Sequence, residues 1–225
     1  MFSHAEASVA TVVGRRGVVG MLAVMALPLA TLSVAQPAAA ESSPADAIAT
    51  IKQFNAALLS TMKVGARADF GQRFEALEPA VDLAFDLPAV LSVSVGPAWA
   101  SLPAPQRGSL LDAFRRYTVA SYVANFDHYS GQSFSVLPRT RDVGAGRLVV
   151  QSRIQPVSGD PTELDYVMQQ TGSGWKIVDV LAAGSISRVA VQRSDFRHLL
   201  SSGGGGALLA SLQRKTSDLS GGAVA

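Results

Sequence analysis

The chain has 225 residues, with 19 Lys and Arg against 17 Asp and Glu, 3 His and no Cys. The near-neutral balance, with scattered basic residues and no aromatic platform among them, excludes a typical basic nucleic-acid-binding protein. The lack of cysteine excludes a thiol nucleophile, a cysteine-bound metal and a disulfide framework, so packing alone must stabilise the fold.

Residues 1–40 have the pattern of a secretory signal peptide. The pair Arg15-Arg16 precedes an apolar run over residues 17–34, and Ala38-Ala39-Ala40 then offers a small-residue cleavage site. We expect export by the Sec route rather than the twin-arginine route, followed by cleavage. Residues 41–225 are long enough to form one domain with its own core. The alternative is a retained membrane anchor, because the apolar run is about as long as a short spanning helix.

The first half of the mature chain is predicted to be helical. Ser43 and Pro44 have the serine cap and first-turn proline of a helix start. Apolar side chains then recur at helical spacing along several segments. Pro79 interrupts the second of these, which predicts a kink or two shorter helices there. The predicted helices span residues 44–64, 69–84, 87–95 and 105–129.

After Gly131 the hydrophobic period changes to two, which is typical of strands. Four strands are predicted at residues 132–137, 147–155, 163–170 and 175–181. The sequence Gly172-Ser173-Gly174 predicts a hairpin turn between the last two. Two closing helices, residues 187–200 and 207–219, are joined by the glycines at 203–206. The fold class is α+β: a curved four-stranded antiparallel sheet packed with helices on one face and around its ends.

The apolar faces of this sheet and of the long helix are expected to meet. The sheet face carries Val150, Ile154, Leu164, Tyr166, Met168, Trp175 and Ile177, and the helix face carries Phe114, Tyr117 and Tyr122. Hydrophobic periodicity alone favours a solid core, and a cup that encloses a cavity cannot be derived from it.

Catalytic candidates are few. His128 and His198 are the histidines after residue 40, and both fit surface positions on or near helices. Asp179 lies in the predicted central strand, where a carboxylate can be a base with a raised pKa or a structural hydrogen-bond acceptor for backbone groups or Arg193. No Gly-x-Ser-x-Gly, His-Glu-x-x-His or Walker sequence is present.

Two segments of the chain carry a recognisable order of motifs. The first carries Phe85-Asp86, Val95-Gly96, Trp99, Gln106-Arg107, Phe114, Tyr117, Tyr122 and Tyr129-Ser130-Gly131. The second carries Gly174-Trp175-Lys176-Ile177-Val178-Asp179-Val180, Gly184-Ser185-Ile186-Ser187 and Gln192-Arg193-Ser194-Asp195-Phe196. Together these motifs resemble the MlaC, or toluene-tolerance, family of periplasmic lipid-binding proteins. The resemblance covers roughly residues 44–215. The run from Gly184 to Ala190 is most similar to the hopanoid-associated HpnM branch.

The resemblance implies an NTF2-like cup with an apolar cavity and no catalytic role. A protein of this kind shields a phospholipid or hopanoid and carries it between membranes. Its expected partners are an inner-membrane transporter of ABC or RND type and an outer-membrane component, with the carrier itself a monomer. The side chains expected to line or close the cavity are Phe85, Val90, Phe114, Tyr117, Tyr122, Tyr166, Met168, Trp175 and Ile177. Neither a cofactor nor a metal is expected.

Three classes of function remain open at this point. A lipid carrier is favoured, because an aliphatic and aromatic lining can solvate acyl chains without charged chemistry. The second class is a non-catalytic envelope adaptor with a filled core. The third is a small-molecule enzyme in an NTF2-like cup, with Asp179 as its base.

Overall fold

The computed structural model describes residues 43–224. The predicted signal peptide at residues 1–40 lies outside this range. Within the described range, no helix combines the length and the apolar character that crossing a bilayer requires.

Helices form the first half of the fold, as predicted, with three differences in detail. The helices are α1 (Pro44–Val64), the 3₁₀ turn η1 (Gly65–Arg67), α2 (Phe70–Ala84), α3 (Leu87–Val95), α4 (Ala98–Ser101) and α5 (Ala104–Asn125). The short α4 was not predicted. Pro79 lies inside α2 without dividing it into two helices. Pro79 is exposed, as is Glu75, whose carbonyl loses its helical hydrogen-bond partner. The long helix α5 ends at Asn125 rather than near Tyr129.

The N-terminus of α1 has the predicted capping geometry. Ser43 is the N-cap, and its side chain and backbone N–H exchange hydrogen bonds with Asp46 in a capping box. The Ser43 N–H donates to Asp46 Oδ2 at 2.7 Å. One face of the helix then buries Ile51, Phe54 and Leu58. This face fixes how α1 lies against the sheet.

The sheet is antiparallel and runs in the order β1-β2-β3-β4-β5. Its strands are β1 (Ser133–Gly144), β2 (Arg147–Gln155), β3 (Thr162–Thr171), β4 (Gly174–Ala182) and β5 (Ile186–Ser187). The predicted four strands are therefore joined by a fifth, which pairs two residues with the end of β4. The predicted turn after Thr171 is confirmed, since Thr171 pairs with Gly174.

Strand β1 is longer than predicted. The predicted strand ended at Leu137, and the next residue, Pro138, cannot donate a ladder hydrogen bond. The structure places a register shift between Val136 and Thr140, and pairing with β2 resumes beyond it. Because β1 is an edge strand, this bulge accommodates the proline without breaking the sheet.

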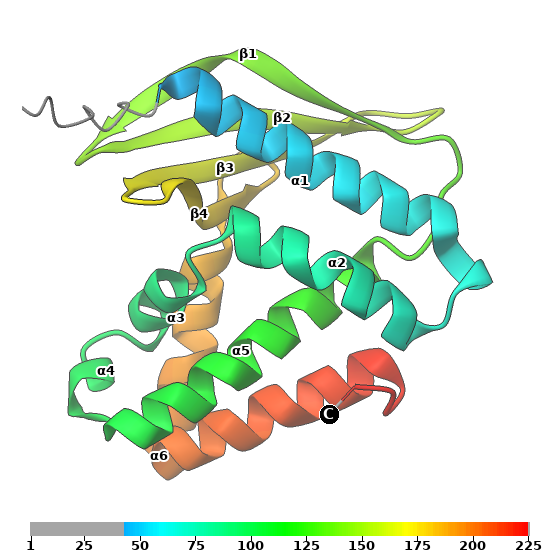
Figure 1. The fold of residues 1–225 in the computed structure, drawn as a ribbon. Coiled ribbons are helices and arrows are strands. Elements are labelled where there is room, and N and C mark those ends of the chain that lie inside the picture. The colour runs from blue at the N-terminus through cyan, green and yellow to red at the C-terminus, as the bar shows by residue number, and fades with distance from the viewer. Residues whose placement is uncertain (1–42, 225) are drawn as a thin grey trace, which may run out of the picture. The chain divides into compact units, whose positions relative to one another are not determined.

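The last helix, α6 (Arg188–Ser220), bends at its glycines. Gly203 and Gly204 have non-helical backbone angles, and Gly204 adopts a φ of 63°. Gly205 also packs closely against Gln106, because a Cβ at this position would lie 2.6 Å from the Gln106 side chain. The predicted glycine joint between two closing helical segments is thus confirmed. Figure 1 shows the second segment running beside α5.

Helices and sheet enclose one core. Figure 1 shows α1 lying across the sheet, with α2, α3, α5 and α6 beyond it. Residues 85–86 connect the two parts: Phe85 forms a parallel bridge with Ile177 of β4, and the Asp86 N–H donates to the Ile177 carbonyl at 3.0 Å. The largest fully buried side chains come from both layers and include Phe54, Phe114, Tyr166 and Ile177. The predicted α+β class is confirmed.

Candidate functional site

A cavity of about 380 Å³ lies between one end of the sheet and the helices α3, α5 and α6. We call it the central cavity. Helices contribute Leu87, Val90, Phe114, Tyr117, Thr118, Ser121, Tyr122, Asn125, Arg188, Val189 and Gln192, the segment after α5 contributes Phe126, and the segment before α3 contributes Phe85. Strands contribute Ile154, Thr162, Leu164, Asp179, Val180 and Ala182. The lining is mostly apolar with a few polar groups, which is the usual composition of a ligand pocket.

Aromatic rings form the wall of the central cavity that faces α1. Phe54 of α1 meets Phe85 edge to face at a centroid distance of 5.4 Å and Tyr122 at 5.2 Å. Tyr122 stacks on Phe126 at 6.0 Å, and Phe126 in turn contacts Phe134 of β1. Helix α5 ends at Asn125, and the next residue, Phe126, lines the central cavity. Rings in these geometries attract one another beyond the area that they bury.

The structure brings five of the nine predicted lining residues to the central cavity: Phe85, Val90, Phe114, Tyr117 and Tyr122. The other four lie elsewhere. Tyr166, Met168 and Ile177 are fully buried in the core, and Phe54 of α1 covers the Tyr166 ring. Trp175 lies in a second groove, between α1, α2 and the β3–β4 turn. These four occupy the part of the sheet nearer α1, whereas the cavity lies nearer the other end of β4.

The Tyr166 hydroxyl does not face the central cavity but donates a hydrogen bond to Asn55 Oδ1 at 3.4 Å. The Asn55 side-chain amide donates to Ser152 Oγ at 3.0 Å. All three residues are buried. They form a polar network between α1 and the sheet, behind the aromatic wall, where each group depends on the others for a partner.

Two charged side chains contribute to the cavity wall in different ways. Arg188, in the first turn of α6, is exposed and forms no hydrogen bond or ion pair with any other residue between 43 and 224. Asp179 is occupied: it accepts from the hydroxyl of Ser187 and from the Val189 N–H, the latter at 3.1 Å. Its other contact is with the Val180 N–H at 2.8 Å. The structural interpretation of Asp179 as an acceptor for backbone groups is confirmed, and its bonds come from β4 and the start of α6 rather than from Arg193.

Asp179→Ala is expected to lower the free energy of unfolding by about 1–2 kcal/mol. The variant removes the carboxylate that caps the first turn of α6 and orients the N-cap Ser187. Urea unfolding of the variant measures the loss. Asp195→Ala is the control, because Asp195 is exposed further along the same helix and its loss is expected to change stability by less than about 0.5 kcal/mol. Equal effects of the two variants would contradict the capping role.

Burial shifts the acidity of two tyrosines at the aromatic wall. The pKa of Tyr122 is raised by burial, and the positive charge of Arg188 opposes the shift. The pKa of Tyr166 is also raised by burial, and the nearby Tyr122 adds to the effect. Both hydroxyls are therefore protonated, and able to donate hydrogen bonds, throughout the neutral range.

Stability is expected to fall as the pH rises above about 10, because the unfolded chain then releases tyrosine protons that the folded chain retains. Each raised tyrosine contributes a slope of up to about 1.4 kcal/mol per pH unit. Below about pH 10 both states hold these protons, and this dependence vanishes. Urea unfolding at several pH values should give a shallower alkaline slope for Tyr122→Phe than for the wild type. An unchanged slope would contradict the burial of this hydroxyl.

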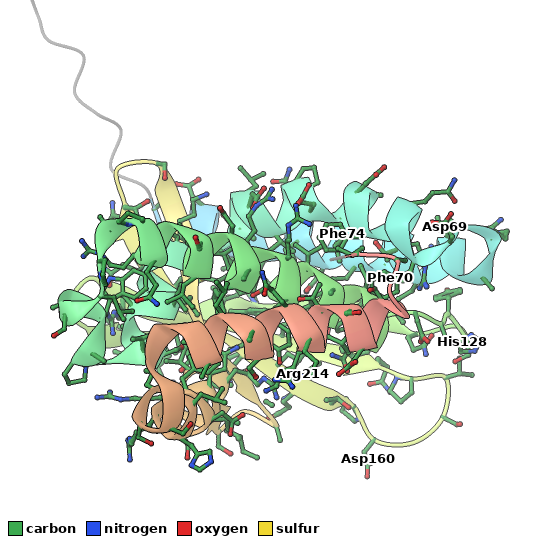
Figure 2. All side chains as sticks on the ribbon, turned by 90° about the horizontal axis from the view of Figure 1, so that it is seen from below. Asp69, Phe70, Phe74, His128, Asp160 and Arg214 are labelled. Carbon is green, nitrogen blue, oxygen red and sulfur yellow. The ribbon has the colours of Figure 1, made fainter. Side chains whose placement is uncertain are left out.

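The histidines are poorly placed for catalysis in the cavity. His128 is exposed beyond the end of α5, and Figure 2 shows it at the periphery of the fold. His198 is exposed on α6. Neither lines the central cavity. Between residues 43 and 224, no group of three or more His, Cys, Asp or Glu side chains could hold a metal ion.

Sequence reasoning missed several lining residues. Ile154 and Leu164 were assigned to the correct sheet face but were not selected, and Phe126 was placed inside a helix that ends before it. The residue types of Arg188 and Gln192 did not mark them as lining residues. Which way they face depends on where α6 begins, at the N-cap Ser187. The amphipathic pattern of α6 was the signal that could have found them.

Comparisons with known proteins agree with this architecture. The family described as MlaC protein matches residues 52–214. A solved structure of the phospholipid-binding protein from Ralstonia solanacearum, in complex with a phospholipid, is similar with a TM-score of 0.68 and 22% sequence identity. The similarity covers 77% of this chain and 98% of that chain. At this identity the likeness shows a shared fold. No curated protein matches the chain.

Proposed function

The chain belongs to the MlaC family, and on this premise we propose that it binds a phospholipid and carries it through the periplasm. The observation that carries the proposal is the central cavity, an apolar space of about 380 Å³ within the family-matched residues. The solved structure with the same fold is that of a phospholipid-binding protein in complex with a phospholipid, which supports the choice of ligand.

The physical driving force is the burial of acyl chains. Each buried CH₂ group stabilises the complex by about 0.8 kcal/mol. Phe114, Val180 and Ala182 offer apolar contacts for such a chain. Arg188, which has no ionic partner in the described range, is suited to a phosphate at the open side of the cavity. In this proposal the five predicted residues at the cavity contact the lipid, and Tyr166, Met168, Trp175 and Ile177 support the wall behind it.

The proposed role is transport without catalysis. The residues before the domain have the pattern of an export signal, which supports a periplasmic location. We propose that the protein is a monomer with an NTF2-like cup. It takes lipid from or delivers it to an inner-membrane transporter of ABC or RND type, and an outer-membrane component is the other partner. This part of the proposal rests on the family and on the sequence resemblance.

A hopanoid is the finer alternative for the cargo. The run from Gly184 to Ala190 supports it through its similarity to the HpnM branch. A rigid terpenoid needs apolar contacts and few polar partners, and the lining of the central cavity offers such contacts. The composition of the bound lipid distinguishes the two cargoes.

The test is mass spectrometry of the organic extract from the full-length protein, expressed with export to the periplasm and purified without detergent. A stoichiometric phospholipid supports the proposed function, and a stoichiometric hopanoid supports the alternative cargo. A clean extract, also after incubation with envelope lipids, would contradict a carrier and favour an adaptor. Turnover of a small molecule that is lost in Asp179→Asn would favour the enzyme class instead.

A further inference from the structure

Three of the residues that line the central cavity are exposed to solvent and mark its mouth. They are Asn125 at the end of α5, Thr162 at the start of β3 and Arg188 at the start of α6. We call these three residues the cavity rim. The other lining residues are buried or half-buried. Because burying a charged headgroup is costly, a lipid in the cavity keeps its headgroup beside the rim.

Arg188 gives the cavity rim a positive charge. It forms no hydrogen bond or ion pair with any other residue in the range 43–224. Burial raises the pKa of Tyr122, another lining residue, and the positive charge of Arg188 opposes that shift. The field of this cation therefore reaches groups inside the cavity.

The carboxylates near the rim do not neutralise this charge. Asp179, the carboxylate among the lining residues, accepts three hydrogen bonds from the start of α6 and from β4. Glu163 forms an ion pair with Arg153 at 3.2 Å. Asp127 and Asp160 are exposed in neighbouring loops, do not line the cavity and are screened by solvent. The rim is thus electropositive.

The stability of α6 does not explain an arginine at position 188. Arg188 is the first residue of the helix, directly after the N-cap Ser187. The helix dipole favours negative side chains in the first turn and disfavours positive ones. A neutral residue at this position should therefore leave the free energy of unfolding unchanged or raise it. A negatively charged ligand at the rim explains the arginine better than the fold does.

We propose that the cavity rim makes the carrier select phospholipids with a net negative headgroup, such as phosphatidylglycerol, over zwitterionic ones, such as phosphatidylethanolamine. The inference rests on the proposed function, because it names the class of phospholipid that the cavity takes. The Arg188 guanidinium pairs with the phosphodiester of either lipid. It repels the ammonium group of the zwitterionic lipid, which finds no lining carboxylate among the described residues that is free to pair with it.

The neutral residues of the rim suit a glycerol headgroup. The Asn125 amide donates to the Ser121 carbonyl at 2.7 Å, which leaves its oxygen to accept from a hydroxyl. Thr162 has a hydroxyl that both donates and accepts. Two uncharged partners beside one cation match a phosphate that is followed by a neutral polyol.

Two soluble probes with identical acyl chains test the selection: dioctanoyl phosphatidylglycerol and dioctanoyl phosphatidylethanolamine. Native mass spectrometry of the exported protein with an equimolar mixture measures the ratio of the two complexes. We expect the wild type to prefer phosphatidylglycerol about tenfold, or by about 1.4 kcal/mol. Arg188→Gln should abolish the preference, and Arg188→Glu should reverse it. Arg197→Gln is the matched control, because Arg197 is exposed on the same helix and does not line the cavity.

The outcomes separate the selection from the proposed function. If the wild type binds both probes equally, or if Arg188→Gln keeps the wild-type ratio, the selection is overturned while the carrier function stands. If Arg197→Gln loses the preference as fully as Arg188→Gln does, the overall charge of α6 selects the headgroup and the role of the rim is overturned. If the wild type binds neither probe, both the selection and the proposed function fail.

Discussion

Replacing Ser121 with tryptophan is expected to weaken phospholipid binding about a hundredfold. Ser121 lines the central cavity from α5, and its hydroxyl donates to the Tyr117 carbonyl of the same helix at 2.7 Å, so replacing it removes only a hydrogen bond within α5. An indole that occupies the space of about four CH₂ groups removes about 3 kcal/mol of burial from the lipid. A titration with phospholipid followed by native mass spectrometry measures the loss.

Ser109→Trp is the matched control for this prediction. Ser109 lies on the same helix and makes the same kind of bond, to the Pro105 carbonyl at 3.3 Å, but it is exposed and does not line the cavity. The control should bind lipid as the wild type does. Similar affinities for the two tryptophan variants, with both folded by circular dichroism, would show that the cavity is not the lipid site.

The sheet shows which strand boundaries hydrophobic periodicity can predict. Leu148, Val150 and Ile154 share one face of residues 147–155 opposite the polar Gln151, Arg153 and Gln155, and β2 spans the predicted range. The pattern of β1 breaks at Pro138, and the prediction stopped there although the strand continues. A bulge depends on where the partner strand runs, and here β2 supplies the residues that resume pairing with Thr140 and those beyond it. Local sequence does not contain that information.

The cavity shows a second limit of sequence reasoning. Alternation assigned Ile154, Leu164 and Ile177 to one face of the sheet, and the first two line the cavity while Ile177 is in the solid core. The difference lies in the position along the strands. Local sequence determines on which face of the sheet a side chain lies. The boundary between the filled core and the cavity depends instead on where α1 crosses the sheet. The structure therefore has a filled core and a cavity beside it.

The roles of the polar residues depend on hydrogen-bond partners at very different distances along the chain. Asp179 was considered as a structural acceptor or as a base, and the hydrogen bond that it accepts from Ser187, eight positions later, supports the structural role. By contrast, Asn55 and Ser152 are 97 positions apart, and Asn55 and Tyr166 are 111 apart. No pattern within α1 marks Asn55 as the partner of two sheet residues, since a polar residue on a mostly apolar helical face has many possible explanations.

Asn55→Leu is expected to lower the free energy of unfolding by about 2–4 kcal/mol. Leucine has a similar shape, so the change removes hydrogen bonds rather than volume. It leaves the Tyr166 hydroxyl and Ser152 Oγ buried without their Asn55 partner, and each such group costs about 1–3 kcal/mol. Urea unfolding monitored by tryptophan fluorescence measures the loss. Ser60→Ala, on the exposed side of the same helix, should have an effect below about 0.5 kcal/mol.

The triple variant Asn55→Leu, Ser152→Ala, Tyr166→Phe separates polar from packing effects. It removes all three polar side-chain groups, and apolar replacement of both partners in a buried hydrogen bond can be nearly neutral. We therefore expect the triple variant to be more stable than Asn55→Leu alone. Independent losses would add up and make the triple variant the less stable of the two, so this result would show that the three groups are coupled. If the triple variant is less stable than Asn55→Leu, the cost arises from packing. The network behind the aromatic wall would then contribute no hydrogen-bond specificity to the position of α1.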